Sequence, residues 1–291
     1  MAPYLLIDTS YSIFYRYFAT HRWYHFAHPE DKFDDDYEWF DNEIFKNMFE
    51  KKFFDSYTKI IKKWKIPNTN IIFLRDCPRK NIWRHEYFDQ YKANRDDEHG
   101  SASGKNFKGG PFFKYVYSHI LPHLEKTKGV TTFIYDCLEA DDLIYLTKNY
   151  LRSKYPDEEI IVVTSDHDLL QIIDDKTTLV TLQNKILNIK SLGSNQLDIE
   201  MKVLRGDPSD NIPGCFKKCG PKTVMKLFND KALLLEKFKK EPGSFDTYTR
   251  NKILVDMSNI PTHFQESFNN ILHSSFSQTI QQHSFASSQL L

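Results

Sequence analysis

Short apolar runs separated by longer amphipathic stretches constrain the fold of this chain most strongly. Four runs are rich in β-branched or aromatic residues and bounded by polar turns, as buried strands are: Tyr4–Ile7, Ile71–Leu74, Thr132–Tyr135 and Ile160–Val163. Val180–Leu182 is a candidate fifth strand. Helical patterns lie between the runs, at Phe45–Trp64, Phe112–Thr127 and Asp141–Lys154. The alternation predicts an α/β fold, with a parallel twisted sheet flanked by helices on both faces.

The strand pattern stops near residue 195. Helices are predicted beyond it, at Leu197–Leu204, Pro221–Phe228 and Ala232–Phe238. We therefore expect a core of residues 1–195 and a helical region of residues 196–273. Residues 96–110 are polar and contain four glycines, which predicts a loop. Residues 274–291 are rich in Ser and Gln, which predicts a disordered tail.

Composition excludes several classes of protein. The 291 residues suffice for a large core, and 40% hydrophobic with 27% charged residues is ordinary for a globular chain. The apolar runs are far shorter than the roughly 18 residues of a membrane span, and no basic flank precedes the first run. Four cysteines do not make a disulfide framework, and the pair Cys215 and Cys219 is a weak zinc motif. We expect an intracellular protein with reduced thiols.

Acidic residues follow each of the four strands. Asp8 follows the first and Asp76 the second, and the remaining acids follow the third and fourth: Glu139, Asp141, Asp142, Asp166 and Asp168. The carboxyl ends of parallel strands share one edge of a sheet, so these groups should converge. Converging carboxylates repel one another unless a cation lies among them. An all-oxygen set of ligands favours Mg²⁺, or Mn²⁺ in its place, over zinc.

This cluster predicts a reaction class. Several carboxylates can hold two metal ions, which together activate a water and stabilise the oxygens of a phosphoryl displacement. Phosphodiester hydrolysis is therefore expected. Taken alone, the acids of residues 139–142 can also be explained as caps of a helix, and the two interpretations can hold together. His167 lies between Asp166 and Asp168 and is interpreted as a structural residue.

Basic residues follow the second strand. Lys92 and Arg95 share a helix face, and aimed at the acids they would hold the scissile phosphate and offset its charge. Tyr91 is a candidate for stacking on a terminal base, and Arg84 for contacting DNA. In isolation the segment is also typical of an ordinary charged helix.

Residues 206–223 form a third feature. Pro221 suits the first position of a helix, whose free N–H groups can clamp a phosphate. Such a clamp reads the nucleic-acid backbone rather than its sequence. We assign it Lys217, Lys218, Gly220, Lys222 and Thr223, and expect Asp207 and Asp210 to face the metals. The 39 basic and 39 acidic residues balance, but setting nine carboxylates aside in a metal site leaves the rest at +9.

Five stretches in this order resemble the 5′→3′ exonuclease and flap endonuclease family, in its bacterial and phage form. They are Leu6-Ile7-Asp8, Tyr91-Lys92-Ala93-Asn94-Arg95, Glu139-Ala140-Asp141-Asp142, Thr164-Ser165-Asp166-His167-Asp168 and Gly206-Asp207-Pro208-Ser209-Asp210-Asn211-Ile212-Pro213-Gly214. The resemblance implies a PIN-like nuclease core, with an arch at about residues 80–115 and a helix-three-turn-helix region after it. It also implies two Mg²⁺ ions and DNA with 5′ ends or flaps as the substrate.

The resemblance also implies a role for each matching residue. One ion would be held by Asp8, Asp76, Glu139 and Asp141. The other would lie near Asp142, Asp166, Asp168, Asp207 and Asp210. Lys92 and Arg95 match residues that contact the reacting phosphate. Gly220, Lys222 and Thr223 match the element that grips duplex DNA, often with a bound K⁺.

The chain departs from the family pattern in three places. The family's hairpin runs glycine, apolar, glycine, proline, lysine, whereas here Lys218-Cys219-Gly220-Pro221-Lys222 lacks the first glycine. Residues 22–41 form a longer connection than usual, which either shapes the substrate path or is a packed surface flap. The tail shows no clear sliding-clamp motif, and we expect a monomer.

Three alternatives stay open at this point. A Toprim-type nuclease or primase module also places acids after strands, but it does not account for residues 84–95 or 206–223. A branched-DNA-binding module without catalysis would predict missing acids. A nuclease of the same family that removes RNA primers, acting on an RNA–DNA hybrid, is the third, because metals and backbone clamps do not read the 2′-hydroxyl.

Overall fold

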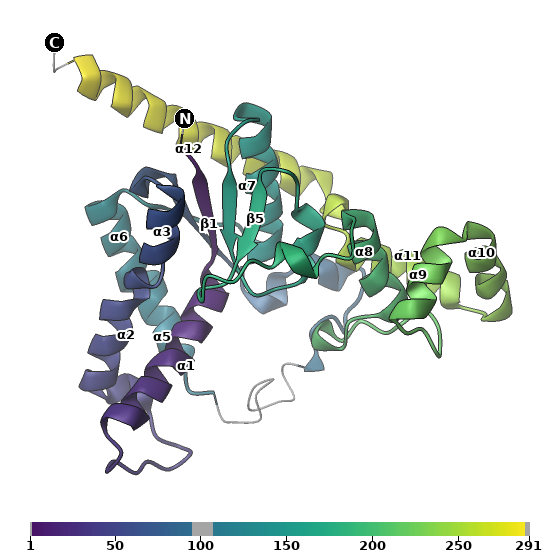
Figure 1. Ribbon diagram of the computed structural model, residues 1–291, viewed down its shortest axis with the longest axis horizontal. Coiled ribbons are helices and arrows are strands. Elements are labelled where there is room, and N and C mark those ends of the chain that lie inside the picture. Colours follow the sequence, from purple (N-terminus) through teal and green to yellow (C-terminus); the bar gives the residue numbers. More distant parts are fainter. Residues whose placement is uncertain (1, 95–106, 289–291) are drawn as a thin grey trace.

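A five-stranded parallel sheet forms the centre of the molecule (Figure 1). The computed structural model describes residues 2–94 and 107–288 of the chain. The strands are β1 (Tyr4–Asp8), β2 (Ile71–Arg75), β3 (Thr131–Ile134), β4 (Ile160–Val163) and β5 (Thr177–Val180). Their spatial order is β3-β2-β1-β4-β5, and every neighbouring pair is parallel. The predicted α/β class and parallel sheet are confirmed.

The sheet is buried on both faces because alternate residues of a strand point to opposite sides. Leu5, Ile7 and Phe73 pack in one core with five helices: α1 (Thr9–Ala27), α2 (Glu43–Asp55), α3 (Thr58–Trp64), α5 (Gly110–Tyr115) and α6 (Leu121–Lys128). Leu6 and Ile72 pack in a second core with α7 (Ala140–Lys154) and α12 (Thr262–Ser288). Two-sided burial explains why the strands are continuous apolar runs.

The elements match the sequence prediction closely, with three shifts. β5 ends at Val180, where the predicted strand begins. The helix predicted over Phe45–Trp64 is divided into α2 and α3 at residues 56–57. The helix predicted over Phe112–Thr127 is one run, in which α5 and α6 are joined by a π-helical segment, Val116–Ile120.

Four helices follow the sheet: α8 (Asn195–Arg205), α9 (Pro221–Asn229), α10 (Lys231–Lys240) and α11 (Ser244–Val255). They take part in two small cores, to which α8 supplies Val203 and Leu204 respectively, and the first of these cores also contains Cys77, Ile82 and Tyr91 from the segment after β2. In Figure 1 they extend to one side of the sheet. This placement agrees with the predicted helical region.

The last helix, α12, returns to the sheet. Phe268 and Leu272 are fully buried on the face covered by α7, and the Phe268 ring lies 5.8 Å from that of Phe133. Phe276 stacks on Tyr150 at 5.5 Å. The expectation of a disordered tail from residue 274 is therefore wrong up to Ser288, where α12 ends. Apolar residues at every fourth position, 264 to 276, carry this helix past the predicted boundary.

The connection between α1 and α2 is a packed flap. Trp39 is buried against Tyr24, with ring centroids 5.3 Å apart, and against Phe45 at 4.8 Å. Asn42 caps α2 and donates to the hydroxyls of Tyr24 and Tyr37, at 3.1 Å each. Of the two interpretations of residues 22–41, the geometry favours the packed surface flap.

No helix in the described part of the chain combines the length and apolar character needed to cross a bilayer.

Replacement of Phe268 by alanine tests the docking of α12. The side chain is fully buried between α7 and the sheet, so its loss should lower the free energy of unfolding by about 3–5 kcal/mol. Urea denaturation measures this, with the exposed His273→Ala on the same helix as the control. Equal stability of the two variants would show that α12 is not part of the core.

Candidate active site

Acidic side chains meet at the carboxyl edge of the sheet, as the strand pattern predicts. Asp8 ends β1 and caps α1, where it accepts a hydrogen bond from the Tyr11 amide at 2.9 Å. Asp76 follows β2 and accepts from the Ala140 amide at 2.8 Å, which ties it to the start of α7. Ser10 Oγ donates to its other oxygen at 2.5 Å. Helix starts thus fix the positions of these carboxylates.

The pKa values of two of these acids record their mutual repulsion. Burial, reinforced by the charge of Asp76, raises the pKa of Asp8 to about 7. Burial and the charges of Asp166 and Asp8 raise the pKa of Asp141 well above its usual value. These groups therefore need a cation to be ionised together at neutral pH.

Glu139 belongs to the same edge but is paired with cations. Lys92 Nζ binds Oε1, and Arg84 Nη1 binds Oε2 at 3.0 Å. Burial alone would raise the pKa of Glu139, yet Lys92 and Arg84 lower it to about 2. Lys92 Nζ also lies 3.6 Å from Asp210 Oδ2, so its charge reaches toward a second group of acids. A left-handed backbone at Lys92, with φ of 57°, aims the side chain there.

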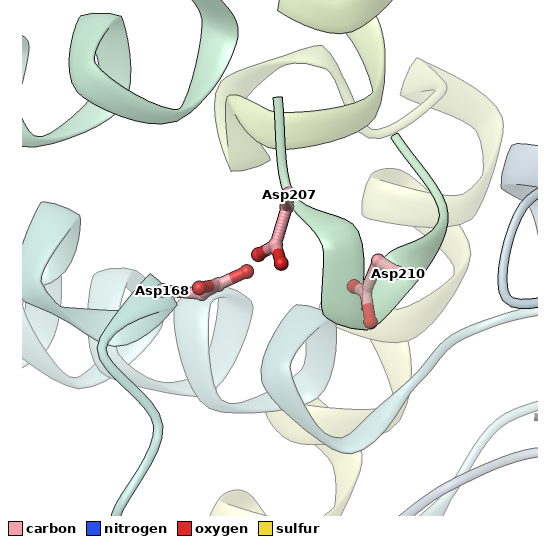
Figure 2. A group of neighbouring side chains, drawn as sticks. All are labelled: Asp168, Asp207 and Asp210. Atoms are coloured by element: carbon pink, nitrogen blue, oxygen red, sulfur yellow. The ribbon is translucent and has the colours of Figure 1, made fainter. Parts of the chain in front are cut away.

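The second group comprises Asp168, Asp207 and Asp210, whose side chains Figure 2 shows pointing toward one another. Each offers a carboxylate oxygen within 4.8 Å of the others. Lys202, on α8, forms ion pairs with Asp168 and, at 2.6 Å, with Asp207. Burial would raise the pKa of Asp207, but Lys202 and the bonds from Ser209 lower it.

The turn that presents Asp207 and Asp210 depends on glycine. Gly206 has φ of 76°, and a Cβ there would lie 2.3 Å from the Ile212 carbonyl oxygen. Asp207 and Ile212 exchange two backbone hydrogen bonds of 2.8 Å across this turn. No other residue fits such a position without moving the backbone. The close approach of the backbone near Ile212 to Gly206 therefore fixes the positions of the Asp207 and Asp210 carboxylates.

Asp142 does not join the carboxylates at the sheet edge. It is fully buried, and Arg84 binds both its oxygens, Oδ1 at 2.7 Å and Oδ2 at 2.9 Å. Trp83 Nε1 and the Glu139 amide also bond Oδ2, at 3.0 and 3.1 Å. The capping box of Glu139 and Asp142 at the start of α7 supports the helix-cap interpretation. The expected metal-facing role of Asp142 does not fit these contacts.

Arg84 and Tyr91 are also not placed as expected. Arg84 is 4% exposed, and its Nε donates a hydrogen bond to the Leu254 carbonyl at 2.8 Å. The prediction that Arg84 contacts DNA does not fit this buried position. Tyr91 is likewise 4% exposed, and its hydroxyl lies 3.0 Å from Glu139 and 3.1 Å from Asp210. A ring in that position is closed to a terminal base. Both residues instead support the carboxylates from beneath.

The predicted phosphate clamp has the expected local form. Pro221 is the first residue of α9, and Gly220 caps it without a side-chain hydrogen bond. Lys217, Lys218 and Lys222 are exposed around this helix end, and Thr223 is half-buried. Lys218 stands where the family pattern has its first glycine and has no positive φ, so the backbone of this hairpin does not need a glycine there.

The remaining site residues are placed as follows. Asp166 is exposed beside the acids of the edge and accepts from the Asp168 amide at 2.8 Å. Arg95 lies outside the described residues, as does most of the predicted loop of residues 96–110. Lys202 was not foreseen. Its only signal in the sequence is its place five residues before Asp207, which fixes no partner.

The fold and the two groups of carboxylates define the class: an α/β protein whose clustered acidic side chains can hold metal ions. Comparison with known proteins gives the family. A family model described as "5'-3' exonuclease, N-terminal resolvase-like domain" matches residues 3–198. The chain therefore belongs to the 5′→3′ exonuclease family, which confirms the resemblance.

Curated relatives agree with this assignment. The chain is 31% identical over 163 residues to a 5′-3′ exonuclease of Buchnera aphidicola, covering 54% of this chain and 51% of that protein. It is 30% identical over 198 residues to a 5′-3′ exonuclease of Mycoplasmopsis pulmonis, covering 64% and 60%. The chain thus matches only half to three fifths of the length of these relatives.

Solved structures from bacteriophage T5 share the fold. The T5 5′-exonuclease with bound zinc ions has a TM-score of 0.64 at 16% identity, over 94% of this chain and 98% of that one. A T5 flap endonuclease in a complex with DNA and metal ions gives 0.64 at 15% identity, over the same shares. The fold expected for the family, including the helical region, is confirmed.

Replacement of Arg84 by methionine should strand Asp142 as a buried carboxylate without a cation. We expect the free energy of unfolding to fall by about 3–5 kcal/mol, measured by urea denaturation. The exposed Arg79→Met is the control, expected to change stability by less than about 0.5 kcal/mol. Adding Asp142→Leu should recover much of the loss, because the uncompensated charge is then gone. Additive losses would contradict a mutual pairing.

The raised pKa of Asp8 predicts a dependence of stability on pH in EDTA. The folded protein keeps this proton up to about pH 7, whereas the unfolded chain releases it near pH 3.8. The native state therefore binds more protons in this window, and stability falls as pH rises through it, by up to about 1.4 kcal/mol per pH unit.

Asp8→Asn is the matched variant, since asparagine also caps helices well. Urea denaturation across this pH window should give a shallower fall for the variant than for the wild type. Equal slopes would contradict the repulsion at this edge.

Proposed function

We propose that this protein is a metal-dependent, structure-specific 5′ nuclease that hydrolyses DNA phosphodiester bonds. One observation carries the proposal: two groups of carboxylates lie together at the carboxyl edge of the sheet, and Lys92 forms ion pairs with a member of each, Glu139 and Asp210. Family membership gives the reaction class, and the edge supplies the residue types that phosphodiester hydrolysis requires. We infer a role in DNA replication or repair.

The donor set suits Mg²⁺. The acids with raised pKa values are oxygen ligands that need a cation, and the group of Asp168, Asp207 and Asp210 consists of carboxylates. Asp8, Asp76, Glu139 and Asp141 would hold one ion. Asp166, Asp168, Asp207 and Asp210 would hold the other. Bound metal supplies an activated water and stabilises charge on the phosphate oxygens.

Lysines take a defined part in this proposal. Lys92 and Lys202 compensate the carboxylates through ion pairs, and each is half-buried with its ammonium among them. Lys92, with Arg95, would turn to the scissile phosphate when metal and substrate neutralise the acids. Both lysines can move because they have long flexible side chains.

The exposed end of α9 is the proposed grip on duplex DNA. Lys217, Lys218 and Lys222 surround amides that no side chain caps, a combination that binds phosphates. Binding of K⁺ near Gly220 and Thr223 is part of the same proposal. RNA–DNA hybrid is the second candidate substrate, because nothing in this arrangement selects against a 2′-hydroxyl.

Cleavage of a 5′-flap duplex labelled at either end tests the function. We expect cutting near the flap junction with Mg²⁺ and none with EDTA. Asp168→Asn should lower turnover by about 10³-fold or more while largely retaining substrate binding, because it removes one of the charges that hold the metal. Product size separates flap cleavage from stepwise exonuclease action.

The exposed Asp157→Asn is a matched control for the same chemical change, expected to cleave normally. Unchanged turnover in Asp168→Asn would refute the metal assignment. Tight binding of the flap without cutting by the wild type would refute a DNA nuclease, and the RNA–DNA hybrid would be the next substrate.

A further inference from the structure

Two histidines lie side by side on α1, away from the carboxylates. His21 and His25 are one turn apart on one helix face, and their Nε2 atoms are 3.4 Å from each other. Their ring centroids are 4.5 Å apart. Twelve residues separate His21 from the start of α1 at Thr9, which is about 18 Å along the helix axis. The pair is therefore remote from the edge where Asp8 caps this helix.

The nitrogen spacing matches that of a metal chelate. A tetrahedral metal with metal–nitrogen bonds of about 2.0–2.1 Å places two imidazole nitrogens about 3.4 Å apart. Histidines four residues apart on a helix are an established way of meeting that spacing. We propose that His21 and His25 form a second metal site, which takes a borderline transition-metal ion such as Zn²⁺ or Ni²⁺ through both Nε2 atoms.

The flap holds the two rings in place before a metal arrives. Trp39 is buried, and its ring contacts both imidazoles edge-on, with centroids 4.6 Å from His21 and 5.4 Å from His25. His25 is exposed, so water can complete the coordination on the open side. Side chains fixed by packing lose little freedom on binding a metal, which favours affinity.

The ligand chemistry separates this site from the carboxylates. Imidazole suits Zn²⁺, Ni²⁺ and Cu²⁺, whereas Mg²⁺ strongly prefers oxygen. Excess Mg²⁺ should thus occupy the carboxylate edge and leave the histidine pair open. This inference does not depend on the proposed nuclease function.

Calorimetric titration with Ni²⁺ in excess Mg²⁺ tests the proposal. The wild type should bind Ni²⁺ with an affinity that falls by about tenfold or more in His25→Ala and in His21→Ala. His123→Ala is the matched control, because His123 is an exposed histidine on α6 and its loss should leave the isotherm unchanged. His25 is exposed, so its alanine variant should keep the fold, which circular dichroism and urea denaturation verify.

Tryptophan fluorescence gives an independent readout. Ni²⁺ held beside Trp39 should quench its emission, and His25→Ala should lose most of that quenching. An isotherm that is the same in His25→Ala, or one that His123→Ala weakens equally, would overturn the proposal. The contact at 3.4 Å would then be only a hydrogen bond between two imidazoles.

Discussion

Repulsion among buried carboxylates is the constraint on which the rest of this structure depends. Acids at the carboxyl edge of the sheet are close enough to raise the pKa of Asp8 to about 7 and that of Asp141 well above its usual value. Such an arrangement costs stability unless positive charge is supplied. Lys92, Lys202 and Arg84 supply it within the chain, each in a different way.

The three cations differ in how firmly they are held. Arg84 is buried and makes four hydrogen bonds, three to the carboxylates of Glu139 and Asp142 and one to the Leu254 carbonyl, so it is a fixed part of the architecture. Its bonds to the Leu254 carbonyl and to Glu139 and Asp142 together join the end of α11 to the start of α7. The two lysines reach the acids by flexible side chains instead. Arg84 thus neutralises carboxylates permanently from beneath the site. The charges of Lys92 and Lys202 lie within the site, where a metal ion can replace them.

Much of the fold could be predicted from the sequence, because strands buried on both faces are continuous apolar runs. β1, β2 and β4 lie within a residue of their predicted positions, and the acids after them converge as expected. β5 was misplaced because its first residues, Thr177 and Thr178, follow a charged turn and carry little apolar signal. The end of the chain was mispredicted because composition outweighed the four-residue spacing from Phe264 to Phe276.

The roles of Arg84, Tyr91 and Lys202 could not be predicted. Arg84 meets Leu254 across 170 residues of sequence, and Tyr91 meets Asp210 across 119. A charged residue near a site can face the solvent, the substrate or the interior, and local pattern does not distinguish these directions. Only packing between the core and the helical region decides it.

Because α12 returns to the sheet, the last helix of the chain packs on the core, and the helical region before it is an insertion in the core rather than a C-terminal addition. The helices α8 to α11 are inserted between β5 and α12, and are attached to the core at both ends (Figure 1). This region is held by two chain crossings, by the Arg84 bond and by a core shared with Cys77, Ile82 and Tyr91. It follows that no single cut near residue 195 separates two intact bodies. The core without α12 would expose the sheet face that Phe268 and Leu272 cover.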